Sequence, residues 1–198
     1  MSDGRIIDRI DGTAIPVRGN NIDTDRIIPA RFLKSITFDG LGDHVFEDDR
    51  QSMSNHPFSN LSYTGASILL VNENFGSGSS REHAPQALKR WGIDACIGES
   101  FSEIFLGNAT TIGLPCATAS AVDITRFMDV AEEVPATRFS LRIDTLVVES
   151  EQFSSSVFIP AAMQTSFLSG QWDATGLLLD QFDDVRQIAA ALPYVKGY

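Results

Sequence analysis

Two serines and an arginine, Ser79, Ser80 and Arg81, follow a glycine-rich turn and stand just before a helical pattern. Serine hydroxyls and a guanidinium donate hydrogen bonds, and the first backbone N–H groups of a helix have no partner within it. The helix dipole adds partial positive charge at the same end. Donors gathered at one point predict a site for a carboxylate or a phosphate.

The elements that must position this site are a strand before it and a helix after it. Residues 65–71 form a short apolar run after a glycine, which is typical of a buried strand. Pro85 falls in the first turn of the helix, where a missing N–H costs little. A second apolar strand at 93–98 makes the pair a parallel, right-handed crossover. Apolar residues at helical spacing between the strands are Ala84, Ala87, Leu88 and Trp91.

Several other interpretations of the glycine and serine run compete with an anion site. Such a run can be a flexible connection. A dinucleotide fingerprint would need a glycine in place of Arg81, and the Gly-Lys-Ser/Thr ending of a P-loop and the G-x-S-x-G elbow are absent. A serine hydrolase that pairs Ser79 with His83 stays open, as does a stand-alone module that binds small carboxylates.

Residues 74–85 read Asn-Phe-Gly-x-Gly-Ser-Ser-Arg-Glu-His-Ala-Pro and carry a resemblance to a known family. The segment resembles the signature of the small subunits of 3-isopropylmalate dehydratases, a family similar to the swivelling fourth domain of aconitase. Two further segments match, residues 21–34 and residues 100–108, the latter followed by Gly-Leu-Pro at 113–115. The resemblance covers about residues 5–190.

The resemblance implies both a fold and an activity. The fold is α/β, a swivel-domain-like three-layer β/β/α arrangement with a parallel β-α-β core and an antiparallel C-terminal hairpin. The activity is that of a hydro-lyase in leucine biosynthesis, which interconverts 2- and 3-isopropylmalate through isopropylmaleate. The small subunit then works only with a large subunit that carries a [4Fe–4S] cluster, on a small dicarboxylate. The small subunits of homoaconitase and of citraconate or dimethylmaleate hydratase share the motif and stay as alternatives.

The resemblance also implies roles for particular residues. Ser79 is the base, as an alkoxide, and Arg81 holds a substrate carboxylate in two-pronged fashion, with Ser80 as a further donor. Thr24 and Asp25 border the site, although Asp-Thr-Asp from spacing alone fits a turn or cap equally well. Residues expected to support the site without touching the reacting atoms are Glu82, His83 and Asn108.

Two positions depart from the family pattern. Ser77 stands where members often have cysteine, which leaves the predicted loop geometry intact. Thr-Phe-Asp at 37–39 occurs where many members have an arginine, so one carboxylate contact is missing or comes from elsewhere. This departure bears on the choice of substrate among related hydroxy diacids.

Composition limits the remaining possibilities. With 198 residues, 43% of them hydrophobic, the sequence predicts one domain over 1–198. A net charge of −11 argues against nucleic acid and anionic membranes as partners. No secretory or membrane-spanning run is present, which predicts a cytoplasmic protein. Cys96 and Cys116 are too few for an iron–sulfur site, so we expect no metal in this chain.

The rest of the chain gives weaker patterns. Residues 35–64 show little periodicity and many turn residues, which predicts a mobile loop that closes over substrate or contacts a partner; a tolerated surface insertion is the alternative. Other expected elements are short strands around a turn at Gly12, a helix capped by Ser100 with Glu103, a strand at 137–149 paired with 155–159, and helices at 160–168 and 180–192.

Overall fold

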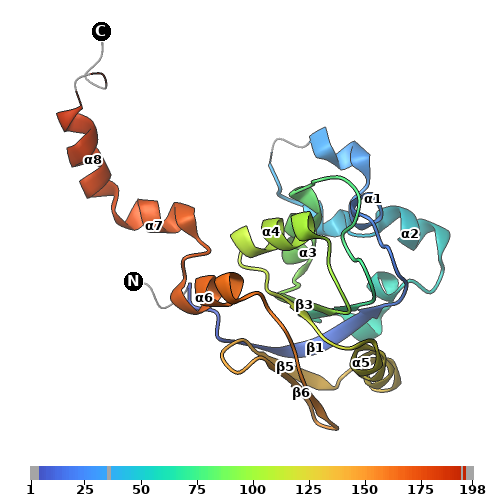
Figure 1. The fold of residues 1–198 in the computed structure, drawn as a ribbon. Helices are drawn as coiled ribbons and strands as arrows, with labels where there is room; N and C mark the ends of the chain where they lie inside the picture. Colours follow the sequence, from blue (N-terminus) through green and yellow to red (C-terminus); the bar gives the residue numbers. More distant parts are fainter. Residues whose placement is uncertain (1–4, 35–36, 193, 195–198) are drawn as a thin grey trace.

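A mixed seven-stranded sheet forms the centre of the computed structural model, which describes residues 5–34, 37–192 and 194. The strands lie in the order β4-β3-β2-β1-β5-β6-β7 (Figure 1). Strands β1 to β4 are parallel, and β5 to β7 continue the sheet in antiparallel orientation from β1. Their bounds are β1 Arg9–Val17, β2 Ile68–Val71, β3 Ala95–Gly98, β4 Cys116–Thr118, β5 Arg138–Arg142, β6 Val147–Ser150 and β7 Ser154–Ser156.

Helices cover both faces of the sheet. Figure 1 shows α3 and α4 on one side of the strands and α5 on the other, with α7 and α8 leading away from the sheet. None of the helices in the described ranges is long and apolar enough to cross a membrane. The α-helices are α1 Thr24–Ile27, α2 Glu47–Ser52, α3 His83–Trp91, α4 Glu103–Thr111, α5 Ala121–Glu133, α6 Ala161–Ser169, α7 Ala174–Asp180 and α8 Phe182–Ala191. Short 3₁₀ helices are η1 Ala30–Lys34, η2 Leu41–His44, η3 Pro57–Ser59 and η4 Leu61–Tyr63.

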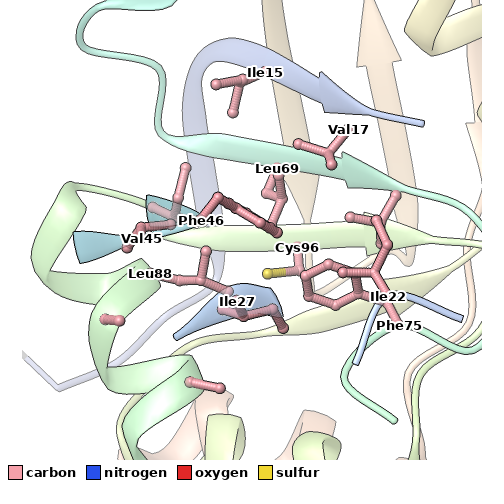
Figure 2. Close-up of a cluster of buried hydrophobic side chains, with 14 of the residues drawn as sticks. Ile15, Val17, Ile22, Ile27, Val45, Phe46, Leu69, Phe75, Leu88 and Cys96 are labelled. Atoms are coloured by element: carbon pink, nitrogen blue, oxygen red, sulfur yellow. The ribbon is translucent and has the colours of Figure 1, made fainter. Parts of the chain in front are cut away.

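The core lies on both sides of β2, which is buried along its whole length. Ile68 and Leu70 pack with α5 and the antiparallel strands, whereas Leu69 and Val71 face the cluster around α3. Figure 2 shows Leu69 in that second cluster. A continuous apolar run is what a central parallel strand requires, and each such side chain contributes about 1.5–3 kcal/mol on burial. The predicted α/β fold with a parallel core is confirmed.

Two strand predictions were wrong in detail. Residues 9–17 form one strand without a turn, and a Cβ at Gly12 would lie 1.8 Å from Ser67 Oγ, so that hydroxyl would have to move to admit one. The alternating run at 137–149 is not one strand but the hairpin of β5 and β6, and β7 pairs with β6. The turn between β5 and β6 was missed because Leu146 takes a positive φ of 56° where glycine or asparagine is usual.

The C-terminal helices differ partly from the prediction. The helix expected at 160–168 is present as α6. The helix expected at 180–192 is α8, which begins at Phe182, while the apolar run at 176–179 belongs to a separate helix, α7. Asp173 caps α7 by accepting a hydrogen bond from the Gly176 N–H at 2.9 Å.

The segment expected to lack regular structure contains four short helices, η2, α2, η3 and η4. Residues 35 and 36, at its start, lie outside the described residues. Because these helices run for only one or two turns, their apolar residues never establish a period in the sequence. The segment nevertheless contributes buried side chains to the core, namely Leu41, Val45, Phe46, Phe58 and Tyr63.

An ion-pair cluster connects residues 37–64 to the motif segment at residues 21–34. The Arg31 guanidinium donates to Glu47 at 2.6 Å and to Asp48 at 2.7 Å and 3.0 Å. These hydrogen bonds lower the pKa of both carboxyls below their usual range. Arg26 likewise donates to Asp49 at 2.8 Å and 3.0 Å. Residues 21–34, the first motif segment in chain order, are therefore connected to α2 across the surface.

Mobility of this segment remains a prediction. We expect amides of residues 37–64 to exchange faster than those of β2 when no partner subunit is present, because single-turn helices open at low local cost. Hydrogen exchange followed by mass spectrometry measures this, with peptides covering 66–71 as the internal reference. Exchange over 37–64 as slow as in β2 would contradict the prediction.

Candidate active site

The glycine-rich loop between β2 and α3 has a defined shape. Gly76 and Gly78 have φ values of 73° and 92°, in the left-handed region that favours glycine. Gly76 is buried, and a Cβ there would lie 2.4 Å from the Phe105 ring. The two glycines therefore serve a fixed turn against α4, which argues against a merely flexible connection.

The three motif segments found in the sequence meet at this loop. On one side, the Gly76 N–H donates to the Ile22 carbonyl at 2.8 Å. On the other side, the Phe75 N–H donates to the Ser100 carbonyl at 3.1 Å, and the Ser102 hydroxyl donates to the Gly76 carbonyl at 2.6 Å. These hydrogen bonds hold the loop between residues 21–25 and residues 100–102.

Ser102 is a positioning residue that the sequence interpretation missed. It caps α4 by accepting from the Phe105 N–H, so the expected cap at Ser100 was wrong. The Ser100 hydroxyl accepts instead from the Asn74 N–H at 2.8 Å. Both serine hydroxyls contact the loop, and only the fold shows that Ser102 is the one that caps α4.

Arg81 pairs with a carboxylate from the first motif segment. Its guanidinium donates to the Asp25 carboxylate, and the side chain is only 14% exposed, against 53% for Asp25. A guanidinium held by its surroundings and facing a more exposed acid is arranged to take a carboxylate. The Asp25 carboxylate is the group that this guanidinium contacts in the structure.

The two serines lie at the surface of the loop, beside this pair. Ser79 and Ser80 are exposed, whereas Thr24 is 2% exposed and its hydroxyl donates to the Ser79 carbonyl at 3.1 Å. Helix α3 begins only at His83, so the serines are farther from its N-terminus than the sequence suggested. Since dipole effects fall off within one turn, Arg81 and loop N–H groups are the closer sources of positive charge.

The residues expected to support the site make contacts of different kinds. Glu82 accepts from the partly buried Gln86 side chain, one turn along α3, at 3.0 Å. The His83 ring meets the Phe38 ring edge-on, with centroids 5.1 Å apart. Asn108 lies in the second turn of α4, and within the described ranges no hydrogen bond joins its side chain to Ser79 or Arg81.

The geometry does not favour a serine hydrolase. Such an enzyme needs its histidine within hydrogen-bond reach of the serine hydroxyl. His83 packs against Phe38, and no bond between it and Ser79 is found across the part of the chain that the structure describes. Among the described residues, Ser79 has no histidine within hydrogen-bond reach to act as the base that this chemistry requires.

The cysteines do not fit an iron–sulfur cluster. Cys96 and Cys116 lie opposite each other on β3 and β4, inside the sheet, and two cysteines are fewer than the three or four thiolates that hold a cubane cluster. Burial raises the pKa of the Cys116 thiol, which keeps it protonated. In the described ranges, no three His, Cys, Asp or Glu side chains gather as a metal site would require.

A sheet with a parallel core and a glycine-rich loop after its second strand defines a known class of domain. A family model described as the aconitase C-terminal domain matches residues 5–119, and the chain belongs to this family.

Similar proteins narrow the class further. The 3-isopropylmalate dehydratase small subunit of Synechocystis sp. is 48% identical over 190 residues, covering 96% of this chain and 95% of that protein. The small subunit of the same name from Thermus thermophilus is 45% identical over 191 residues, covering 94% and 95%. A solved 3-isopropylmalate dehydratase structure from Methanocaldococcus jannaschii has a TM-score of 0.65 at 24% identity, covering 87% of this chain and 98% of that chain, and shows the shared fold.

Proposed function

We propose that this chain is the small subunit of a 3-isopropylmalate dehydratase. The observation that carries the proposal is the guanidinium of Arg81 holding a carboxylate beside the exposed Ser79. Two relatives of that name match nearly the whole chain. They favour this function over the small subunits of homoaconitase and of citraconate or dimethylmaleate hydratase, and over a stand-alone carboxylate-binding module.

The reaction needs a base at one carbon and help for a leaving group at the next. A proton leaves the carbon next to one carboxylate of 2-isopropylmalate, the C–H electron pair forms the double bond, and hydroxide leaves from the neighbouring carbon. Water then adds to isopropylmaleate in the opposite sense. Ser79, as an alkoxide, takes the proton at Oγ and becomes a neutral hydroxyl that returns it to the other carbon.

Arg81 positions the substrate carbon that loses its proton. A substrate carboxylate replaces Asp25 on its guanidinium, which the exposed Asp25 side chain permits by swinging into solvent. Two parallel N–H···O bonds fix the plane of the carboxylate and aim the neighbouring C–H at Ser79. Ser80 adds a donor at the same carboxylate, and Asp25 then lines the edge of the site.

The second requirement, help for the departing hydroxyl group, is met outside this chain. Since Cys96 and Cys116 cannot ligate a cluster, we assign the [4Fe–4S] cluster to the large subunit. Such a cluster supplies a Lewis acid for the departing hydroxyl group. The assembly is expected to work in the cytoplasm on a free dicarboxylate, without nucleic acid or membrane as partner.

Co-expression tests the proposal directly. The full chain is produced with the large subunit of the same organism, purified anaerobically, and given 2-isopropylmalate. Isopropylmaleate, which absorbs in the ultraviolet, should accumulate and then disappear into 3-isopropylmalate. A complex that acts on citraconate or homoaconitate but leaves isopropylmalate untouched would assign the chain to one of the related hydro-lyases.

The isolated chain should be inactive and free of iron. The physical reason is that its two thiols are buried and too few to hold a cubane cluster. Iron and sulfide analysis after anaerobic reconstitution, together with the same absorbance assay, checks this. Stoichiometric iron and sulfide on the lone chain, or turnover without the large subunit, would be the opposite result.

A further inference from the structure

We infer that Thr24 is a positioning residue that locks the peptide unit between Ser79 and Ser80. This inference rests on the proposed function and deepens it, because it says how the loop presents its base. Thr24 is 2% exposed, so its hydroxyl has no open path to a substrate. The hydroxyl instead donates to the Ser79 carbonyl at 3.1 Å.

Thr24 is itself held firmly enough to act in this way. Its N–H donates to the Ser77 carbonyl at 2.9 Å, and its carbonyl accepts from the Ile28 N–H at 3.0 Å. Its branched side chain has few rotamers available. Asp23 caps the same turn by accepting from the Arg26 N–H at 2.8 Å. The hydroxyl of Thr24 is therefore a fixed donor underneath the loop.

Because a peptide unit is planar, a hydrogen bond that holds its carbonyl oxygen also sets the direction of its N–H group. In a trans peptide the carbonyl and the following N–H point in opposite directions. With the Ser79 carbonyl directed at the buried Thr24, the Ser80 N–H is directed to the exposed side of the loop. That N–H has no backbone or side-chain acceptor anywhere in the ranges that the structure describes. It is a donor aimed at the side from which a substrate arrives.

Two neighbouring residues, Thr24 and Asp25, thus hold the two parts of the loop that the proposed mechanism uses. Thr24 holds the Ser79–Ser80 peptide, and Asp25 holds the Arg81 guanidinium until a substrate carboxylate arrives. Preorganised N–H donors stabilise developing negative charge at no cost in reorganisation. Thr24 therefore favours the alkoxide of Ser79 indirectly, by keeping the Ser80 N–H in place.

The test compares Thr24→Val, which removes the hydroxyl at constant shape, with Thr24→Ser, which keeps it. In the complex with the large subunit, Thr24→Val should lower kcat by roughly 10- to 100-fold, somewhat less than deleting such a donor outright. The pH at which kcat reaches half its maximum should rise, because the alkoxide forms less readily. Thr24→Ser should restore both values.

Thr125→Val is the matched control, since the Thr125 hydroxyl donates to the Ala121 carbonyl at 2.8 Å on α5, away from the loop. It should leave kcat and the pH profile unchanged. Two outcomes would overturn the inference. One is a Thr24→Val complex with wild-type kcat and pH profile, even if less stable. The other is a Thr24→Ser variant as impaired as Thr24→Val.

A measurement without turnover separates this inference from the proposed function. The ¹⁵N order parameter of the Ser80 amide in the isolated chain should be near the rigid value of about 0.85, and should fall toward about 0.6 in Thr24→Val. Thr24→Ser should match the wild type. An unchanged order parameter in Thr24→Val overturns the inference whatever the activity. A wild-type complex inactive on isopropylmalate overturns the proposed function alone.

Discussion

Replacing Ser79 by alanine should lower kcat by a factor on the order of 10² to 10⁴ and leave KM little changed. In the proposed mechanism, the substitution removes the group that takes the proton from carbon. It leaves Arg81, the proposed carboxylate-binding residue, in place, and so should remove an interaction that matters mainly in the transition state. Steady-state kinetics of the assembled complex with 2-isopropylmalate give both constants.

The structure explains why this variant should fold normally. Ser79 is exposed, and its contact with the body of the protein is through the backbone carbonyl that accepts from Thr24. The shape of the loop depends on Gly76, whose position leaves no room for a Cβ, and on the Ser102 hydroxyl. None of these contacts involves the Ser79 side chain.

Ser169→Ala serves as the control for this experiment. Ser169 is an exposed serine at the end of α6, outside the motif segments, and its replacement should leave kcat and KM unchanged. A pull-down with the large subunit confirms that each variant assembles. A Ser79→Ala complex that is fully active at saturating substrate would end the case for Ser79 as the base.

Local patterns in the sequence predicted the centre of the fold well. The apolar run of β2, the glycine-rich loop and the helical spacing of α3 each depend on neighbouring residues, and each is present in the structure. A parallel crossover then follows from chain geometry alone. The elements that position Ser79 and Arg81 could therefore be found without the structure.

Elements that depend on tertiary contacts could not be found in this way. Phe46 and Phe58 are buried in the core, yet each belongs to a one- or two-turn segment that has no period to detect. The hairpin of β5 and β6 turns at Leu146, a residue type that gives no turn signal. In both places the rest of the fold imposes the local conformation.

The candidate site was predicted as a set of residues but not as an arrangement. Asp25 and Arg81 pair across 56 positions of sequence, and only the convergence of the motif segments brings them together. Thr24 was expected beside the substrate, whereas its buried hydroxyl faces the Ser79 carbonyl. Sequence motifs name such residues, and hydrogen bonding within the fold assigns what each one touches.

Changing Arg81 to lysine should raise KM by roughly tenfold or more and lower kcat as well. A double loss of this kind follows if the guanidinium both binds the substrate carboxylate and aims its neighbouring C–H at Ser79. Lysine keeps the positive charge but offers a single point contact in place of the planar fork. A purely electrostatic role for Arg81 would leave both constants nearly unchanged.

Arg18→Lys provides the matched control for this last experiment. Arg18 makes a two-pronged contact with Glu132, at 2.7 Å and 2.9 Å, on an exposed surface outside the motif segments. An exposed pair of this kind contributes on the order of 1 kcal/mol or less to stability, so its loss should not alter kinetics. If Arg81→Lys instead only weakens assembly, activity returns to the wild-type level at high subunit concentration. Recovery of both kcat and KM under those conditions would show that Arg81 supports the interface between subunits and does not hold the substrate.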